Sequence, residues 1–132
     1  MKRSIVACAA GLVVWILLVS ILNRLLRLFL AGYAAAEPAM NFTLGMMVAR
    51  LAIAAVTSVV AGAVVARIAP ARPRLPWLVG AILLALFLPE HVLVLWQRFP
   101  VWYHLTFLIT LVPLVVLGAH LARGFPAAHA AA

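Results

Sequence analysis

Four long apolar runs, separated by short polar segments, dominate the pattern along the chain. They cover residues about 4–22, 42–68, 75–96 and 101–121. Each is close to or above the roughly 20 residues with which an α-helix crosses the hydrocarbon core of a bilayer. Because lipid offers no hydrogen bonds to the backbone, a segment of this kind must be helical. The pattern therefore predicts an all-α polytopic membrane protein, a single domain built as a bundle of four transmembrane helices, with a disordered tail at 123–132.

The segments between the runs carry residues that end or interrupt helices. Pro38 breaks the pattern before the second run, and Asn41 is expected to cap the second helix. Glu37, in the same connection, is expected to be a solvated loop acid. Pro89 lacks a backbone donor, so it is expected to kink the third span just before Glu90.

Composition agrees with a membrane protein. The chain is 69% hydrophobic, against about 45–50% in soluble domains. Its formal net charge is +8, but the basic residues are scattered between the apolar runs, so nucleic-acid binding is not expected. Their expected partner is the lipid bilayer and its head groups. The single cysteine, Cys8, excludes an internal disulfide.

The distribution of lysine and arginine predicts an orientation. The first apolar run is longer than the roughly 7–15 residues of a signal-peptide core, so we expect it to be retained as a span. Four spans then place the two termini and the second connection on one side, with six basic residues there against three on the other. Because positive residues accumulate in cytoplasmic segments, both termini are expected in the cytoplasm. The arginine- and alanine-rich composition favours a bacterial inner membrane.

Four strongly polar residues lie inside the predicted spans: Arg50, Glu90, His91 and His104. At about 1.5 Å per residue, Arg50 is roughly 12 Å from the start of the second span, and Glu90 is roughly 9 Å from the end of the third. In a four-span topology both depths fall in the outer half of the bilayer. The sequence therefore predicts an intramembrane polar cluster there.

Two interpretations of this cluster remain open. Arg50 and Glu90 could form a buried ion pair that fixes helix register, with a histidine as hydrogen-bond partner. Alternatively, the cluster could line a water-accessible cavity or a proton-linked ligand site, because ionisable groups within a membrane commonly mark function. No metal or other cofactor is expected, because the sequence lacks a spaced ligand motif. No arrangement of catalytic residues is present either, so an enzyme is not expected.

Small residues recur every four positions along the second span. They are Ala54, Ser58, Gly62 and Ala66. Such a ridge allows another helix to approach closely in a membrane. It leads to the first hypothesis for function, a non-enzymatic subunit or accessory protein that docks on a membrane partner or on itself through this ridge. The second hypothesis is a small homo-oligomeric transporter or channel that uses Glu90 as a protonatable intramembrane site.

The segment Phe99-Pro100-Val101-Trp102-Tyr103-His104-Leu105, followed by Pro113 and Gly118-Ala119, resembles uncharacterised small four-helix bacterial membrane proteins. The resemblance covers mainly the third and fourth spans and implies a four-helix membrane fold without an established activity. Small multidrug resistance transporters fit less well, because the first span, Ser4 to Leu22, contains no glutamate. Quinone-linked disulfide-forming enzymes need cysteine pairs, which Cys8 alone cannot provide.

Overall fold

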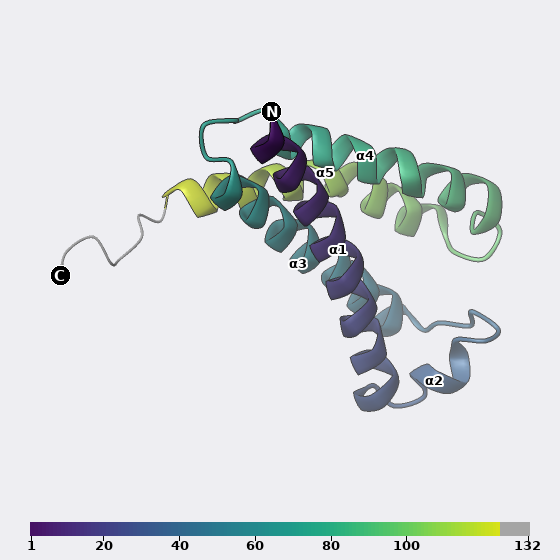
Figure 1. Ribbon diagram of the computed structural model, residues 1–132. Helices are drawn as coiled ribbons and strands as arrows, with labels where there is room; N and C mark the ends of the chain where they lie inside the picture. Colours follow the sequence, from purple (N-terminus) through teal and green to yellow (C-terminus); the bar gives the residue numbers. More distant parts are fainter. Residues whose placement is uncertain (125–132) are drawn as a thin grey trace.

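The computed structural model describes residues 1–124, and throughout this part of the chain the secondary structure is helical (Figure 1). The elements in chain order are α1 (Lys2–Phe29), α2 (Tyr33–Ala36), α3 (Leu44–Ile68), α4 (Leu75–Pro89), the π-helix η1 (Glu90–Val94) and α5 (Val101–Gly124). Helices α1, α3, α4 with η1, and α5 are each long and apolar enough to cross a membrane. The predicted all-α fold with four transmembrane helices is confirmed. Of the tail predicted at 123–132, residues 123 and 124 belong to α5, and the remainder lies outside the described residues.

The first connection differs from the prediction at the start of α3. The N-cap of α3 is Thr43, whose hydroxyl oxygen accepts a hydrogen bond from the backbone N–H of Met46 at 3.3 Å. Asn41 instead donates its backbone N–H to the carbonyl of Ala36 at 3.0 Å, directly after Met40 adopts a positive φ of 54°. The expectation that Asn41 caps this helix is therefore wrong, because the chain is still turning at residue 41.

The interruption expected at Pro89 takes the form of a π-helical turn. Proline has no N–H to donate within a helix, and the hydrogen-bond pattern widens directly after it. The backbone N–H of Leu95 bonds to the carbonyl of Glu90, five residues earlier, at 2.9 Å. Single π-turns of this kind are often found at functional sites. The third span ends at Val94 and therefore carries its irregular backbone beside Glu90 and His91.

Figure 1 shows two helix pairs that lie close together at one end of the molecule and diverge at the other. The N-terminus, the end of α3, the start of α4 and the end of α5 lie at the converging end. At the opposite end, α2 and the loop after it lie between α1 and the turn that precedes α5. Aromatic rings join these segments, since Phe42 stacks on Tyr33 at 5.2 Å and on Phe99 at 5.8 Å between ring centroids.

Helices α3 and α5 run in the same direction and pack through two matching rows of buried residues. The row on α3 is the ridge of small residues predicted from the sequence, and the row on α5 consists of Tyr103, Phe107, Leu111, Val115 and Ala119. Interdigitation of rows spaced by four residues on both helices is the commonest class of helix packing in globular proteins. At Gly62 the contact is so close that a Cβ atom would lie 1.8 Å from the carbonyl oxygen of Val115.

This packing corrects the proposed role of the ridge. Ala54, Ser58, Gly62 and Ala66 are all buried within the chain. Helix α5 covers Gly62, and α1 reaches Ser58 through the indole Nε1 of Trp15, which donates to the Ser58 hydroxyl at 3.0 Å. The ridge therefore joins helices of one molecule and is not a surface on which a partner could dock.

Large apolar side chains cover the outward faces of the four long helices. Examples are Ile16, Leu86 and Ile109, whose exposed fractions are 49%, 59% and 67%. Contiguous exposed apolar surface on this scale is unusual for a soluble monomer. Lipid is the solvent that suits it.

Candidate functional site

A cavity of about 200 Å³ lies between the long helices. Its lining comes from α1, α3, α5 and the irregular end of the third span: Trp15, Val19, Asn23, Arg50, Ala54, Phe87, Glu90, His91, Leu95, Tyr103 and Phe107. A second cavity, of about 130 Å³, shares Arg50, Glu90 and Leu95 with the first. Arg50 and Glu90 therefore lie at the boundary between the two cavities, and the loop after α2 borders the smaller one.

Two tyrosine hydroxyls hold the Arg50 guanidinium. Its Nε donates to the Tyr103 hydroxyl at 3.2 Å, and its Nη1 donates to the Tyr33 hydroxyl at 2.5 Å. The Phe42 ring lies 5.0 Å from the central guanidinium carbon, within the range of a cation–π contact. Tyr33 is fully buried and Tyr103 nearly so. The site thus places a half-buried cation among neutral partners.

The Arg50–Glu90 ion pair, the first of the two interpretations, does not form. Within residues 1–124, the ion pair present joins Arg27 to Glu37. Two of the Arg50 nitrogens donate to tyrosine hydroxyls, while Glu90 is exposed on η1 and also lines the cavity. Both predicted residues therefore line the same cavity without direct contact.

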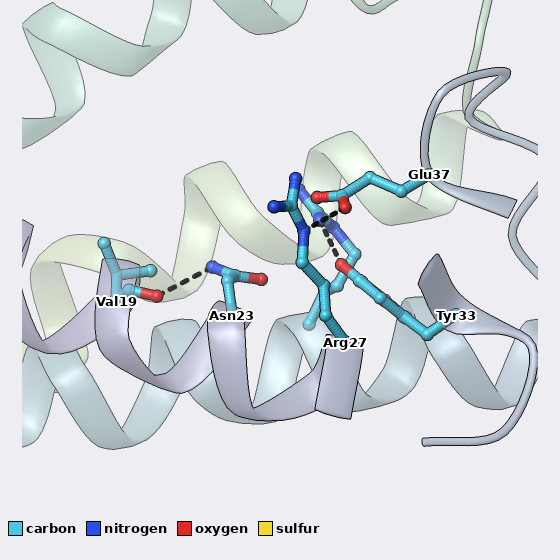
Figure 2. A network of polar contacts seen from close by, with 6 residues as sticks. Val19, Asn23, Arg27, Tyr33 and Glu37 are labelled. Atoms are coloured by element: carbon cyan, nitrogen blue, oxygen red, sulfur yellow. Dashed lines mark hydrogen bonds and ion pairs between the residues drawn. The ribbon is translucent and has the colours of Figure 1, made fainter. Parts of the chain in front are cut away.

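Figure 2 shows the polar residues at the end of α1. The Arg27 Nε donates to a Glu37 carboxylate oxygen, and the Glu37 side chain is only 26% exposed. The expectation of a solvated loop acid at Glu37 is therefore wrong. Asn23 donates its Nδ2 to the carbonyl of Val19 at 2.8 Å, whereas its Oδ1 is buried and has no partner among the residues that the structure describes. Asn23 lines the larger cavity, and its Oδ1 is itself shielded from solvent.

The two predicted histidines form a buried pair. The Nδ1 atoms of His91 and His104 lie 2.9 Å apart, and the side chains are 5% and 0% exposed. At this distance one Nδ1 must carry the hydrogen that the other accepts. Phe107 stacks on His91 at 4.5 Å and Trp96 on His104 at 5.0 Å. His91 lines the cavity, and His104 lies directly behind it.

Three of the four site residues predicted from the sequence thus line one cavity. The fourth, His104, is hydrogen-bonded to His91, which is one of these three. Sequence reasoning missed Asn23, Tyr33 and Tyr103. The tyrosines could have been sought from the sequence, because Arg50 needs a polar partner at its own depth in the membrane. Among residues 1–124, no group of three or more histidine, cysteine or acidic side chains gathers in a geometry suited to a metal ion.

The cavity combines two oppositely charged residues with an aromatic wall. Arg50 provides a cation and Glu90 a carboxylate. The rings of Trp15, Phe87 and Phe107 form part of its wall, with centroids 4.7 Å apart for the first pair and 5.7 Å for the second. Apolar walls with a few convergent polar groups are typical of sites for small molecules.

The four spanning helices and the cavity within them define an all-helical multi-pass membrane protein. No protein-family model, curated protein or solved structure matches the chain. The resemblance of the third and fourth spans to small bacterial membrane proteins therefore stays a prediction, and function is argued from the cavity.

Proposed function

We propose that this protein is a small non-enzymatic membrane carrier, and that the cavity bordered by Arg50 and Glu90 is its solute-binding site. The observation that carries the proposal is the state of Arg50. It lies within a spanning helix, lines the cavity, and forms no ion pair within the described part of the chain. A charge at membrane depth is costly unless it is paired or reaches water or a ligand. Binding of a solute to Arg50 would explain why this energetically costly charge is present.

The backbone around the cavity favours the same proposal. Non-helical or distorted backbone is tolerated at membrane depth where it borders a cavity or is buried in protein. The π-turn that follows Pro89 carries both Glu90 and His91, which line the cavity. A residue whose role was only to fix helix register would not need this irregularity.

The accessory-subunit hypothesis stays a prediction. Its proposed docking ridge is buried between α3 and the chain's own helices, so a partner would need a different surface. The carrier proposal includes the orientation expected from the basic residues, with both termini in the cytoplasm of a bacterial cell. The cavity then lies in the outer half of the inner membrane.

Thiol labelling of the cavity tests the carrier proposal. Cys8→Ala removes the native cysteine, and Ala54→Cys then places one thiol in the cavity wall. Ala52→Cys is the matched control, because Ala52 lies on the same helix but is exposed on its apolar outer face. A charged, membrane-impermeant thiol reagent is applied to right-side-out and inside-out vesicles.

A carrier exposes its binding site to each side of the membrane in turn. We therefore expect Ala54→Cys to be labelled from both faces and Ala52→Cys from neither, because a thiol needs water to ionise and react. Labelling of Ala54→Cys from one face alone, or from neither, would refute transport through this cavity.

A further inference from the structure

We infer that the solute bound in this cavity is a small zwitterion, whose carboxylate binds Arg50 and whose ammonium group binds at Glu90. This inference rests on the proposed carrier function, because it names the substrate class of the same site. Three observations carry it: the arrangement of hydrogen-bond donors, the arrangement of acceptors, and the balance of charge and volume in the cavity.

Arg50 provides the site for the carboxylate. A guanidinium has five N–H donors in a planar fork that matches a carboxylate. The two tyrosine hydroxyls take one donor on Nε and one on Nη1. The remaining donors have no partner among the described residues, and the fork is held in place before any ligand arrives. Donors fixed in this way bind an anion with little further loss of side-chain freedom.

Glu90 provides the site for the ammonium group. Glu90 lines the cavity, and its carboxylate has no ion pair or side-chain hydrogen bond within residues 1–124. An ammonium group supplies the donors that this carboxylate lacks. The rings of Trp15, Phe87 and Phe107 add faces that attract a cation.

The charges of the cavity wall favour a zwitterion over a simple anion or cation. The cavity wall carries one cation, Arg50, and one carboxylate, Glu90. A simple anion would face the Glu90 carboxylate, and a simple cation would face the Arg50 guanidinium. A zwitterion pairs with both groups and brings no net charge to membrane depth. His91 lines the same wall, but its Nδ1 is already engaged by His104.

The volume is large enough for a small solute. About 200 Å³ corresponds to roughly seven waters at about 30 Å³ each. That is the space of a solute with about the same number of non-hydrogen atoms, such as a small amino acid.

Calorimetric titration of the full-length protein in lipid nanodiscs at neutral pH tests the inference. The probes are L-alanine, propionate and ethylammonium, which represent the zwitterion and its two halves. We expect L-alanine to bind at least about tenfold more tightly than either half. Arg50→Gln is expected to weaken L-alanine binding by at least about thirty-fold, because it removes one partner of a desolvated charge pair. Arg24→Gln, at an exposed position outside the cavity, is the matched control and should leave the affinity unchanged.

Glu90→Gln provides a readout that a structural role would not change. Removing the carboxylate should weaken L-alanine and strengthen propionate, so that the preference between the two probes reverses. If Arg50→Gln fails to fold, Arg50→Lys keeps the charge without the planar fork and should still weaken L-alanine by about tenfold. An unchanged affinity in either Arg50 variant would overturn the inference.

The remaining outcomes separate this inference from the carrier proposal. If propionate or ethylammonium binds the unaltered protein as tightly as L-alanine does, the cavity is a simple ion site and the zwitterion assignment fails. If no probe binds, yet Ala54→Cys is labelled from both faces, the assignment fails while the carrier stands. If L-alanine binds as expected but labelling occurs from one face only, the ligand class holds and transport fails.

Discussion

Replacing Gly118 by alanine should force α3 and α5 apart. A Cβ at this position would lie 1.9 Å from the carbonyl oxygen and 2.6 Å from the carbonyl carbon of Val59. Ordinary contact begins at 3.4 Å, so the two backbones must separate by about 1.5 Å at this point. Both obstructing atoms belong to the backbone of a helix, which cannot rotate away as a side chain can. The clash can therefore be relieved only by moving the two helices apart.

The magnitude follows from the nature of this contact. Adding a methyl group to a well-packed core costs typically about 1–3 kcal/mol and occasionally more. The cost of Gly118→Ala should lie at or above the upper end of this range, because separating the backbones also loosens neighbouring contacts such as that of Gly62 with Val115. We expect the free energy of unfolding to fall by about 3 kcal/mol. The double variant Gly62→Ala/Gly118→Ala should lose less than the sum of the single variants, because both relieve their clash by the same movement.

Gly45→Ala is the matched control on α3. Its new Cβ would meet only the Thr43 hydroxyl at 4.0 Å, so the change should be neutral or stabilise by up to about 1 kcal/mol through lower backbone entropy. The assay is unfolding in mixed detergent micelles, followed by circular dichroism as the fraction of dodecyl sulfate rises. If Gly118→Ala unfolds at the same midpoint as Gly45→Ala, the direct backbone contact between the helices is refuted.

Three further predictions concern the polar groups and use the same unfolding assay. Tyr33→Phe removes a 2.5 Å hydrogen bond to the guanidinium of Arg50 and should cost about 1.5–3 kcal/mol; an unchanged midpoint would exclude this bond. A double-mutant cycle of Arg50→Gln and Glu90→Gln should give a coupling below about 0.5 kcal/mol, because no ion pair joins them; a coupling above about 1 kcal/mol would restore the ion-pair interpretation. The corresponding cycle of Arg27→Gln and Glu37→Gln should give a small coupling that weakens with added salt; a salt-independent coupling would contradict an exposed pair.

The four helices were predictable because the bilayer restricts what an apolar run can do. A segment of about 20 apolar residues has to satisfy its own backbone in lipid, and each of the four runs does so as a helix. The small ridge on the second span was also readable, since its period of four residues is that of a helix face. The sequence did not show which helix this ridge would contact. The matching row on α5 is made of larger residues, and no period in the sequence pairs one row with the other.

The partners of Arg50 could not be predicted for a different reason. Tyr33 belongs to a four-residue helix that follows Gly32, whose φ is +77°. The path of the chain after such a turn depends on backbone angles that the sequence pattern does not specify. The same turn brings Glu37 back to Arg27. Depth alone suggested Glu90 as the partner of Arg50, but depth does not determine which side of a helix a residue faces.

The histidine pair illustrates a third limit. His91 follows Pro89 within a π-turn, and a wider turn rotates every later residue away from its α-helical direction. Ideal α-helical geometry therefore misplaces His91 relative to the fourth span. The sequence indicated that both histidines lie in the outer half of the membrane. Their 2.9 Å contact depends on the distortion itself.

The cavity and the tight helix contact are two results of one gradient in side-chain size. Along the buried row of α5 the residues become smaller toward the C-terminus: Tyr103, Phe107, Leu111, Val115 and Ala119. The facing ridge on α3 stays small after Arg50. The two helices therefore touch through their backbones near Gly62 and Gly118 and are held apart where Arg50 meets Tyr103. Because close packing excludes water only where the surfaces match, the cavity opens at the wide end. The glycines that fix the narrow end thus also determine where the cavity lies, and with it the site proposed for a solute.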